Sequence, residues 1–193
     1  MSKDGVPLDR RAFFTQGFRR VLGKAVDSVN ERVSASNYVR PPGALPEAAF
    51  LGACTRCGKC TEVCPVHAIS PLPLDRGLAA GTPVLDVAGR ACVMCDDIPC
   101  AASCPTGALD VPGGLWQVLR LSAITIDTER CIAFRDVNCG VCAQVCPLGV
   151  AALDLDHGGR PVVGAACTGC GVCISACVTL PSSILSQPIG SYR

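Results

Sequence analysis

Short apolar stretches recur through most of this chain of 193 residues, separated by segments rich in glycine, proline and cysteine. Brief runs of valine, isoleucine and leucine that are bounded by such residues predict short strands. We predict strands at 83–87, 123–127 and 161–163, each just before a cysteine-rich segment, and further strands at 108–111 and 150–155, each just after one.

The first forty residues follow a different pattern. Apolar residues from Phe14 to Val29 recur at a spacing of three and four, with Arg19, Arg20 and Lys24 between them, which predicts an amphipathic helix. We assign 1–43 to this basic helix and a linker, and 44–193 to one further domain. The segment 10–32 either lies on a membrane surface or partner, or packs on its own domain.

Four cysteine-rich runs lie between the predicted strands, at 54–65, 92–105, 131–147 and 167–178. The first reads C-x2-C-x2-C-x3-C-P; the second and third widen one gap, and the fourth repeats the first spacing with Val178 in place of the proline. The runs use all sixteen cysteines of the chain: Cys54, Cys57, Cys60, Cys64, Cys92, Cys95, Cys100, Cys104, Cys131, Cys139, Cys142, Cys146, Cys167, Cys170, Cys173 and Cys177.

This spacing is typical of [4Fe-4S] ferredoxins. One tight loop offers three thiolates to three corners of a cube, and the last cysteine of the run binds the cluster of a second run. Four runs therefore predict four [4Fe-4S] clusters in two pairs, with all sixteen cysteines as ligands. Zinc knuckles would leave half of each run unexplained, and closely spaced cysteines suit disulfides poorly. The predicted fold is α+β, with two ferredoxin-like two-cluster units built from four strand, cysteine-loop, helical-turn and strand repeats.

Composition and charge narrow the choice of partners. Residues 1–40 hold eight Lys/Arg and four Asp/Glu, and residues 41–193 hold nine and twelve, so a basic arm precedes an acidic body. The sequence has no basic patch with interleaved aromatic residues, the pattern typical of nucleic-acid binding. Residues 161–192 contain no charged side chain, but their cysteines, glycines and prolines exclude a membrane-spanning helix. This stretch either docks on a partner or folds back over a cluster.

The chain shows no catalytic constellation, phosphate loop or dinucleotide fingerprint, so we expect an electron carrier and not an enzyme. Three alternatives stay open: an assembly factor for a redox enzyme, a redox sensor, and a subunit of a cytosolic oxidoreductase complex. Arg10-Arg11-Ala12-Phe13-Phe14 looks like the core of a twin-arginine export signal, but no apolar segment follows it. We therefore expect a cytoplasmic location or the cytoplasmic face of the membrane, with the periplasm as the alternative.

The irregular gaps resemble those of the NapG/MauM group of ferredoxin-type proteins. The resemblance rests on the segments 92–100 and 104–109, the third-run end 139–142, and 166–171 with the proline-less Cys177-Val178. It implies redox partners: a membrane-bound quinol-oxidising subunit and a reductase or cytochrome.

The resemblance also implies a pairing of runs. In related four-cluster subunits the first run pairs with the fourth and the second with the third. Cys177 would then complete the cluster of the first run and Cys64 that of the fourth, while Cys146 would serve the second and Cys104 the third. Pairing of neighbouring runs stays open.

Overall fold

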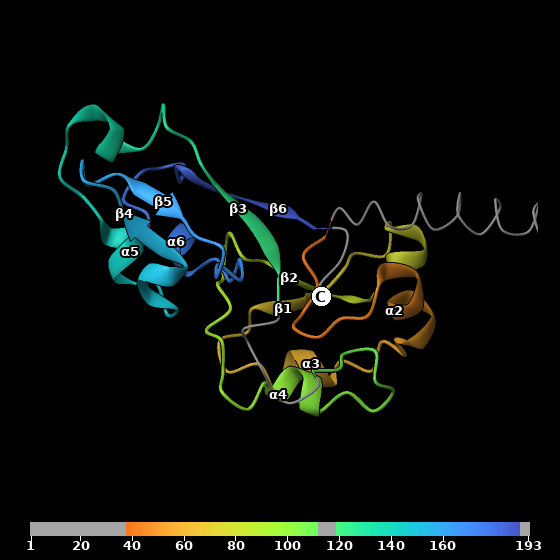
Figure 1. Cartoon of the computed structure of the whole chain (residues 1–193). Helices are drawn as coiled ribbons and strands as arrows, with labels where there is room; N and C mark the ends of the chain where they lie inside the picture. The colour runs from red at the N-terminus through yellow and green to blue at the C-terminus, as the bar shows by residue number, and fades with distance from the viewer. Residues whose placement is uncertain (1–37, 112–118, 190–193) are drawn as a thin grey trace, which may run out of the picture. The chain divides into compact units, whose positions relative to one another are not determined.

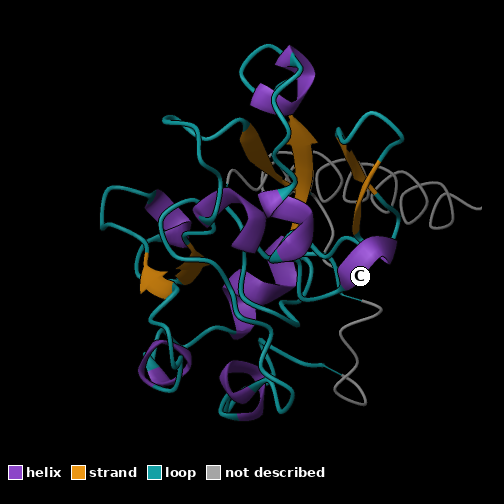
Figure 2. Ribbon diagram, turned by 90° about the vertical axis from the view of Figure 1, so that its left-hand side faces the viewer, coloured by secondary structure: helices purple, strands orange, loops and turns teal. Residues whose placement is uncertain are grey.

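The computed structural model describes residues 38–111 and 119–189 (Figure 1). By its internal contacts the chain divides into Met1–Ala35 and Ser36–Arg193, and the description below concerns the second unit. The predicted helix at 14–29 and the arginine pair lie outside the described residues. Within them, short helices and strands are joined by long loops (Figure 2).

Residues 38–111, here called the first half, contain the first two cysteine runs. Strands β1 and β2 pair antiparallel, with Ile69 opposite Leu85. The elements in order are α2 (Glu47–Ala53), α3 (Lys59–Glu62), β1 (Ile69–Pro71), η1 (Gly77–Ala79), β2 (Pro83–Leu85) and α4 (Pro99–Ala102).

Residues 119–189, the second half, contain the third and fourth runs. Two antiparallel pairs frame them: β3 with β6, where Ile126 lies opposite Ile184, and β4 with β5, where Leu153 lies opposite Val163. The elements in order are β3 (Ser122–Ile126), η4 (Ile132–Arg135), α5 (Val141–Gln144), η5 (Gly149–Ala151), β4 (Leu153–Leu155), β5 (Pro161–Val163), α6 (Val172–Ser175) and β6 (Ile184–Pro188).

Most of the predicted strands are present. Those before the second, third and fourth runs form β2, β3 and β5, and the stretch at 150–155 ends in β4. The predicted strand at 108–111 is wrong, because this segment makes only an isolated bridge between Leu109 and Ala44. Strands β1 and β6 were not predicted, since neither stands out as an apolar run. The repeat of strand, cysteine loop, helical turn and strand is thus complete in the second half and reduced in the first.

The described part of the predicted linker is built into the first half. Val39 and Arg40 are buried, and Arg40 is fully so. Arg40 donates from Nε to the Glu47 carboxylate at 3.0 Å and from Nη1 to Thr82 Oγ1 at 2.9 Å. Its guanidinium also lies over the ring of Phe50, 4.7 Å from the centroid. These contacts tie the start of the described chain to α2 and to the loop before β2.

The described part of the charge-free stretch divides between core and surface. Ile174 and Ile184 are buried, whereas Val178 and Leu180 are 56% and 97% exposed. In residues 38–111 and 119–189, no helix is long and apolar enough to cross a bilayer.

Candidate functional site

All sixteen cysteines lie in the described residues, and none is in a disulfide. They gather around four cavities, each lined by the first three cysteines of one run and the last cysteine of the neighbouring run. Site I is lined by Cys54, Cys57, Cys60 and Cys104; site II by Cys92, Cys95, Cys100 and Cys64; site III by Cys167, Cys170, Cys173 and Cys146; and site IV by Cys131, Cys139, Cys142 and Cys177.

Neighbouring runs therefore pair, and the pairing of first with fourth and second with third is wrong for this chain. The physical reason is the contact between the short helices that carry the third cysteine of each run. Helix α3 packs on α4, and α5 packs on α6. Figure 1 shows each helix beside its partner. Each contact brings the last cysteine of one run to the cavity of the next.

The backbone of the cysteine loops turns repeatedly through the left-handed region. The residue just before each short helix has positive φ: Gly58, Gly140 and Gly171 in the first, third and fourth runs, and Ile98 in the second. Alternation of right- and left-handed residues points successive N–H groups into one concavity, an arrangement found at many Fe–S sites. The loops are thus shaped to hold a group of negative charge.

Ile98 is the exception that the sequence did not signal. Its φ is +42°, a conformation that a β-branched residue adopts only under strain. The wider gap of the second run places it directly before Pro99, and its side chain is 3% exposed within the apolar core. Burial of the side chain offsets the backbone strain.

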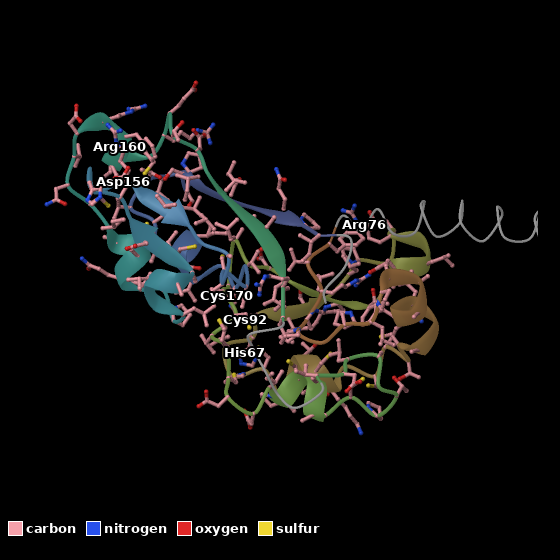
Figure 3. All side chains as sticks on the ribbon, in the orientation of Figure 1. His67, Arg76, Cys92, Asp156, Arg160 and Cys170 are labelled. Carbon is pink, nitrogen blue, oxygen red and sulfur yellow. The ribbon has the colours of Figure 1, made fainter. Side chains whose placement is uncertain are left out.

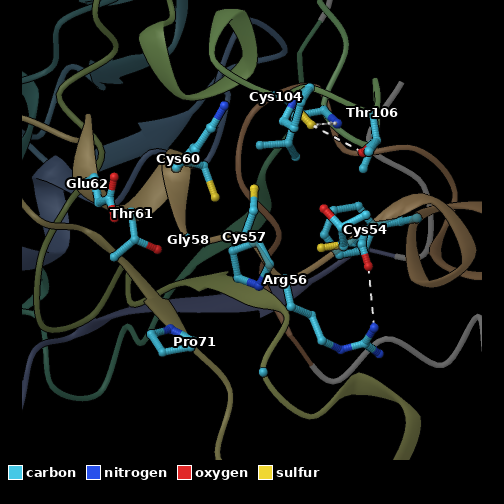
Figure 4. Close-up of a pocket in the computed structure, with 18 residues that line it drawn as sticks. Cys54, Arg56, Cys57, Gly58, Cys60, Thr61, Glu62, Pro71, Cys104 and Thr106 are labelled. Atoms are coloured by element: carbon cyan, nitrogen blue, oxygen red, sulfur yellow. Dashed lines mark hydrogen bonds between the residues drawn. The ribbon is translucent and has the colours of Figure 1, made fainter.

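Site I is the most open of the four sites. Its cavity measures about 870 Å³ including the mouth, against about 350, 340 and 320 Å³ for sites II, III and IV. Figure 4 shows the sulfurs of its four cysteines around a shared space. Cys57 is exposed. Arg56 donates to the carbonyl oxygens of Ala80 and Leu78, both at 2.9 Å, and so anchors this loop to the η1 segment.

The thiols between paired sites are deeply buried. Burial, together with the nearby Cys92 and Cys60, raises the pKa of Cys100 to about 12. Burial, together with the nearby Cys170, Cys167 and Cys142, likewise raises the pKa of Cys173 to about 12. Because a coordinated thiol is deprotonated outright, such thiols become stable as thiolates only when a metal compensates their charge.

The pKa of Cys177 is lowered, in contrast to those of Cys100 and Cys173. Burial raises its pKa, but hydrogen bonds from the hydroxyls of Ser183 and Thr179 outweigh this and lower it to about 6. Thr179 Oγ1 lies 3.2 Å and Ser183 Oγ 3.4 Å from the sulfur. Sequence analysis missed these hydroxyls, although a run of Thr and Ser after the proline-less Val178 was a visible signal. They stabilise negative charge on the sulfur of site IV.

Cys104 has a weaker form of the same environment. Burial again opposes ionisation, but N–H groups of Leu109 and Thr106 and the Thr106 hydroxyl lower the pKa of Cys104. Leu109 N lies 3.4 Å from its sulfur.

The donor sets fit [4Fe-4S] clusters. Each cavity is lined by four thiols, and among the four linings a carboxylate, Glu62, occurs only at site I. N–H groups of Met94 and Gly169 face the thiols of Cys92 and Cys167. In the described ranges no three His, Cys, Asp or Glu side chains converge where a single metal ion would bind. The assignment of each cysteine as a ligand remains a prediction.

Comparison with known proteins identifies the two halves. A 4Fe-4S dicluster domain matches residues 53–108 and another matches residues 123–178, which are the two pairs of neighbouring runs. No solved structure matches the chain significantly.

Three relatives are informative. The ferredoxin-type protein NapG of Escherichia coli is 36% identical over the whole chain and 94% of its own length. The methylamine utilization ferredoxin-type protein MauM of Paracoccus denitrificans is 41% identical over 78% of the chain and 71% of its own length. The ferredoxin-type protein NapF of E. coli is 31% identical over 74% of the chain and 82% of its own length. The chain therefore belongs to the NapG/MauM family of ferredoxin-type iron-sulfur proteins, and its two dicluster domains carry four [4Fe-4S] clusters.

Proposed function

We propose that this protein relays single electrons between a quinone-linked membrane partner and a redox enzyme. In this proposal the cysteines of sites I to IV are the cluster ligands, in the four sets given above. Each cluster, when bound, takes up and releases one electron. The residues of the chain hold the four groups, exclude water from them and set their relative potentials.

The observation that carries the proposal is the enclosure of four complete thiol sets in one body. Within each half the helices that carry the third cysteines of the two runs pack together, α3 on α4 and α5 on α6. A protein that only needed metal for stability would not require paired sites that exchange their last cysteines.

Sites I and IV are the proposed contacts for the partners. Site I has the exposed Cys57, flanked by Arg56 and Lys59. Site IV lies beside Val178, and Leu180, two residues further on, is 97% exposed. An exposed leucine beside a buried redox site suits a partner that docks through an apolar surface. Replacing Leu180 by glutamate should slow electron exchange with one partner and leave the iron content unchanged.

Anaerobically purified protein provides the direct test. We expect about sixteen irons per chain, stepwise reduction by a quinol-oxidising membrane fraction, and reoxidation by an accepting redox enzyme or cytochrome, followed by stopped-flow absorbance. Clusters that no donor reduces and no acceptor reoxidises would end the proposal.

A variant separates the relay from an assembly factor. Cys57→Ala removes one proposed ligand of site I. A relay loses steady-state electron flux even when mature enzyme is already present, whereas an assembly factor changes only the yield of mature enzyme.

We further propose that the protein works in the cytoplasm or on the cytoplasmic face of the membrane, with residues 10–32 as a surface contact. Cell fractionation with N-terminal sequencing of the purified protein tests this; recovery from the periplasm would overturn it.

A further inference from the structure

The two halves meet at one ligand from each. The backbone N–H of Cys92, a site II cysteine, donates to the carbonyl oxygen of Cys170, a site III cysteine, at 2.9 Å. Figure 3 labels both residues and shows them side by side where the two halves adjoin.

Buried contacts hold this junction from both sides. Thr168 Oγ1 lies 3.5 Å from Met94 Sδ, and Thr168 is 1% exposed. Gly171 is packed so tightly that a Cβ atom there would lie 2.4 Å from the carbonyl oxygen of Val87. Cys170 is part of the apolar core of the first half. The contact is thus a packed interior and not a loose touching of loops.

This junction completes a series. Sites I and II adjoin where helix α3, which carries Cys60, packs on α4, which carries Cys100. Sites III and IV adjoin in the same way through α5 and α6, which carry Cys142 and Cys173. Cys92 and Cys170 supply the step between these two pairs. The open site I and the hydroxyl-rich site IV then stand at opposite ends of the series.

We propose that electrons pass through the four sites in the order I, II, III, IV, or in reverse, and cross between the halves at the hydrogen bond from Cys92 N–H to the Cys170 carbonyl, with Met94, Thr168 and Gly171 as positioning residues. The proposal rests on the relay function above. One electron leaves the group held in site II and enters the group held in site III, so one site is oxidised as the other is reduced. No bond forms or breaks, and no proton moves.

Selective removal of clusters tests the order without any partner protein. The double variant Cys57→Ala/Cys139→Ala lacks one ligand in each outer site and keeps sites II and III. Its counterpart, Cys95→Ala/Cys167→Ala, keeps sites I and IV. Both are prepared anaerobically as full chains, fully reduced with dithionite and examined by EPR, with iron content expected at about half that of the wild type.

The order predicts strong magnetic interaction in the first double variant and little in the second. A split or broadened spectrum from sites II and III, beside narrow independent signals from sites I and IV, supports the series. Equal interaction in both variants, or stronger interaction between sites I and IV, overturns it.

A second experiment leaves every ligand in place and decides the matter if the double variants lose all their iron. Gly171→Ala places a Cβ against the Val87 backbone, at a φ of +88°. The matched control is Gly159→Ala, also at positive φ (+73°) but in the turn between β4 and β5, with no atom within 4 Å of the added Cβ. Flash photoreduction followed by time-resolved absorbance measures redistribution of electrons between the halves.

We expect Gly171→Ala to lose the fast redistribution phase and Gly159→Ala to keep it. Thr168→Val, which removes the hydroxyl that faces Met94 and Cys170, should slow the phase to a smaller extent and serves as the deciding variant if Gly171→Ala fails to load iron. Unchanged redistribution in the iron-loaded variant overturns the crossing point. If the wild type shows fast redistribution but exchanges electrons with no partner, the relay function fails while the order of sites stands.

Discussion

The two halves of the protein hold the same pair of cysteine loops by different means. The second half uses strands: β3 pairs with β6 over five residues on each strand, and β4 pairs with β5. In the first half, the counterpart of the outer pair is the single bridge between Ala44 and Leu109. There, the buried Arg40–Glu47 pair and a larger apolar core replace the missing strand pairing.

The cores of the two halves differ accordingly. Apart from cysteines, the buried cluster of the second half consists of Ile124, Leu153, Ile174 and Ile184. The cluster of the first half adds an aromatic ring, Phe50, and recruits Leu121 from across the boundary. In this protein, then, one two-cluster unit is held by a closed pair of strands and the other by a supplementary core.

Removal of iron should have the largest effect on the stability of the two halves. Because small domains whose core is built around metal ligands fold only with the metal bound, we expect the apo-protein to be largely unfolded. The backbone amides of the second half, which has the smaller core, should lose all protection from hydrogen exchange. Amides of the first half, such as Leu85 N–H, which donates to the carbonyl oxygen of Val39 at 2.8 Å, should keep part of theirs. Hydrogen exchange read by mass spectrometry, with and without chelator, measures this.

The control for iron removal is reconstitution with iron and sulfide, which should restore protection in both halves. A native-like circular dichroism spectrum after complete iron removal would contradict the prediction. Greater residual protection in the second half would reverse the comparison.

Loss of the buried pair between Arg40 and Glu47 should cause the next largest loss of stability. Arg40→Met leaves the Glu47 carboxylate buried without its partner, since both residues are almost fully buried. Breaking a buried pair in this way costs about 3–5 kcal/mol. Denaturant unfolding of the holo-protein should show this loss, and hydrogen exchange should place it in the first half.

The double variant Arg40→Met/Glu47→Leu separates the cost of an unpaired buried charge from the loss of side-chain packing. Because it removes both charges, it should recover most of the lost stability. A single variant as stable as the wild type would mean that the buried pair contributes nothing to the first half.

The sequence predicts the parts of this molecule that depend on local spacing and misses those that depend on tertiary contact. Cysteine intervals indicate four clusters, and apolar runs indicate β2, β3 and β5. The partner of each run depends on which helices pack together, which no local pattern records, and an analogy with other four-cluster proteins led to the wrong pairing. Arg40 escaped notice because arginine beside two prolines is usually exposed, whereas here it is 0% exposed.

The hydroxyls around Cys177 distinguish the outer site of the second half from that of the first. Hydroxyl donors stabilise negative charge on a ligand sulfur, so they favour the reduced state and raise the reduction potential. Removing them in Ser183→Ala/Thr179→Val should lower the potential of site IV by roughly tens of millivolts. An EPR-monitored redox titration measures the shift.

The matched variant for the first half is Thr106→Val, which removes the single hydroxyl 3.8 Å from Cys104 Sγ. It should lower the potential of site I by less than the double variant lowers that of site IV. Equal shifts would show that hydrogen bonding does not distinguish the two outer sites.

The smallest expected effect concerns exposed charge within the first half. Asp97 and Asp96 lie beside Cys95 in site II, where after burial they raise the pKa of its thiol, whereas Lys59 lies in the loop of site I. A carboxylate disfavours the more negative reduced state and a cation favours it. Asp97→Asn should therefore raise the potential of site II, and Lys59→Gln should lower that of site I.

Because exposed charges are screened by solvent, each shift should not exceed about a few tens of millivolts and should shrink with added salt. Shifts of the same sign in both variants would show that charge does not set the difference between these paired sites.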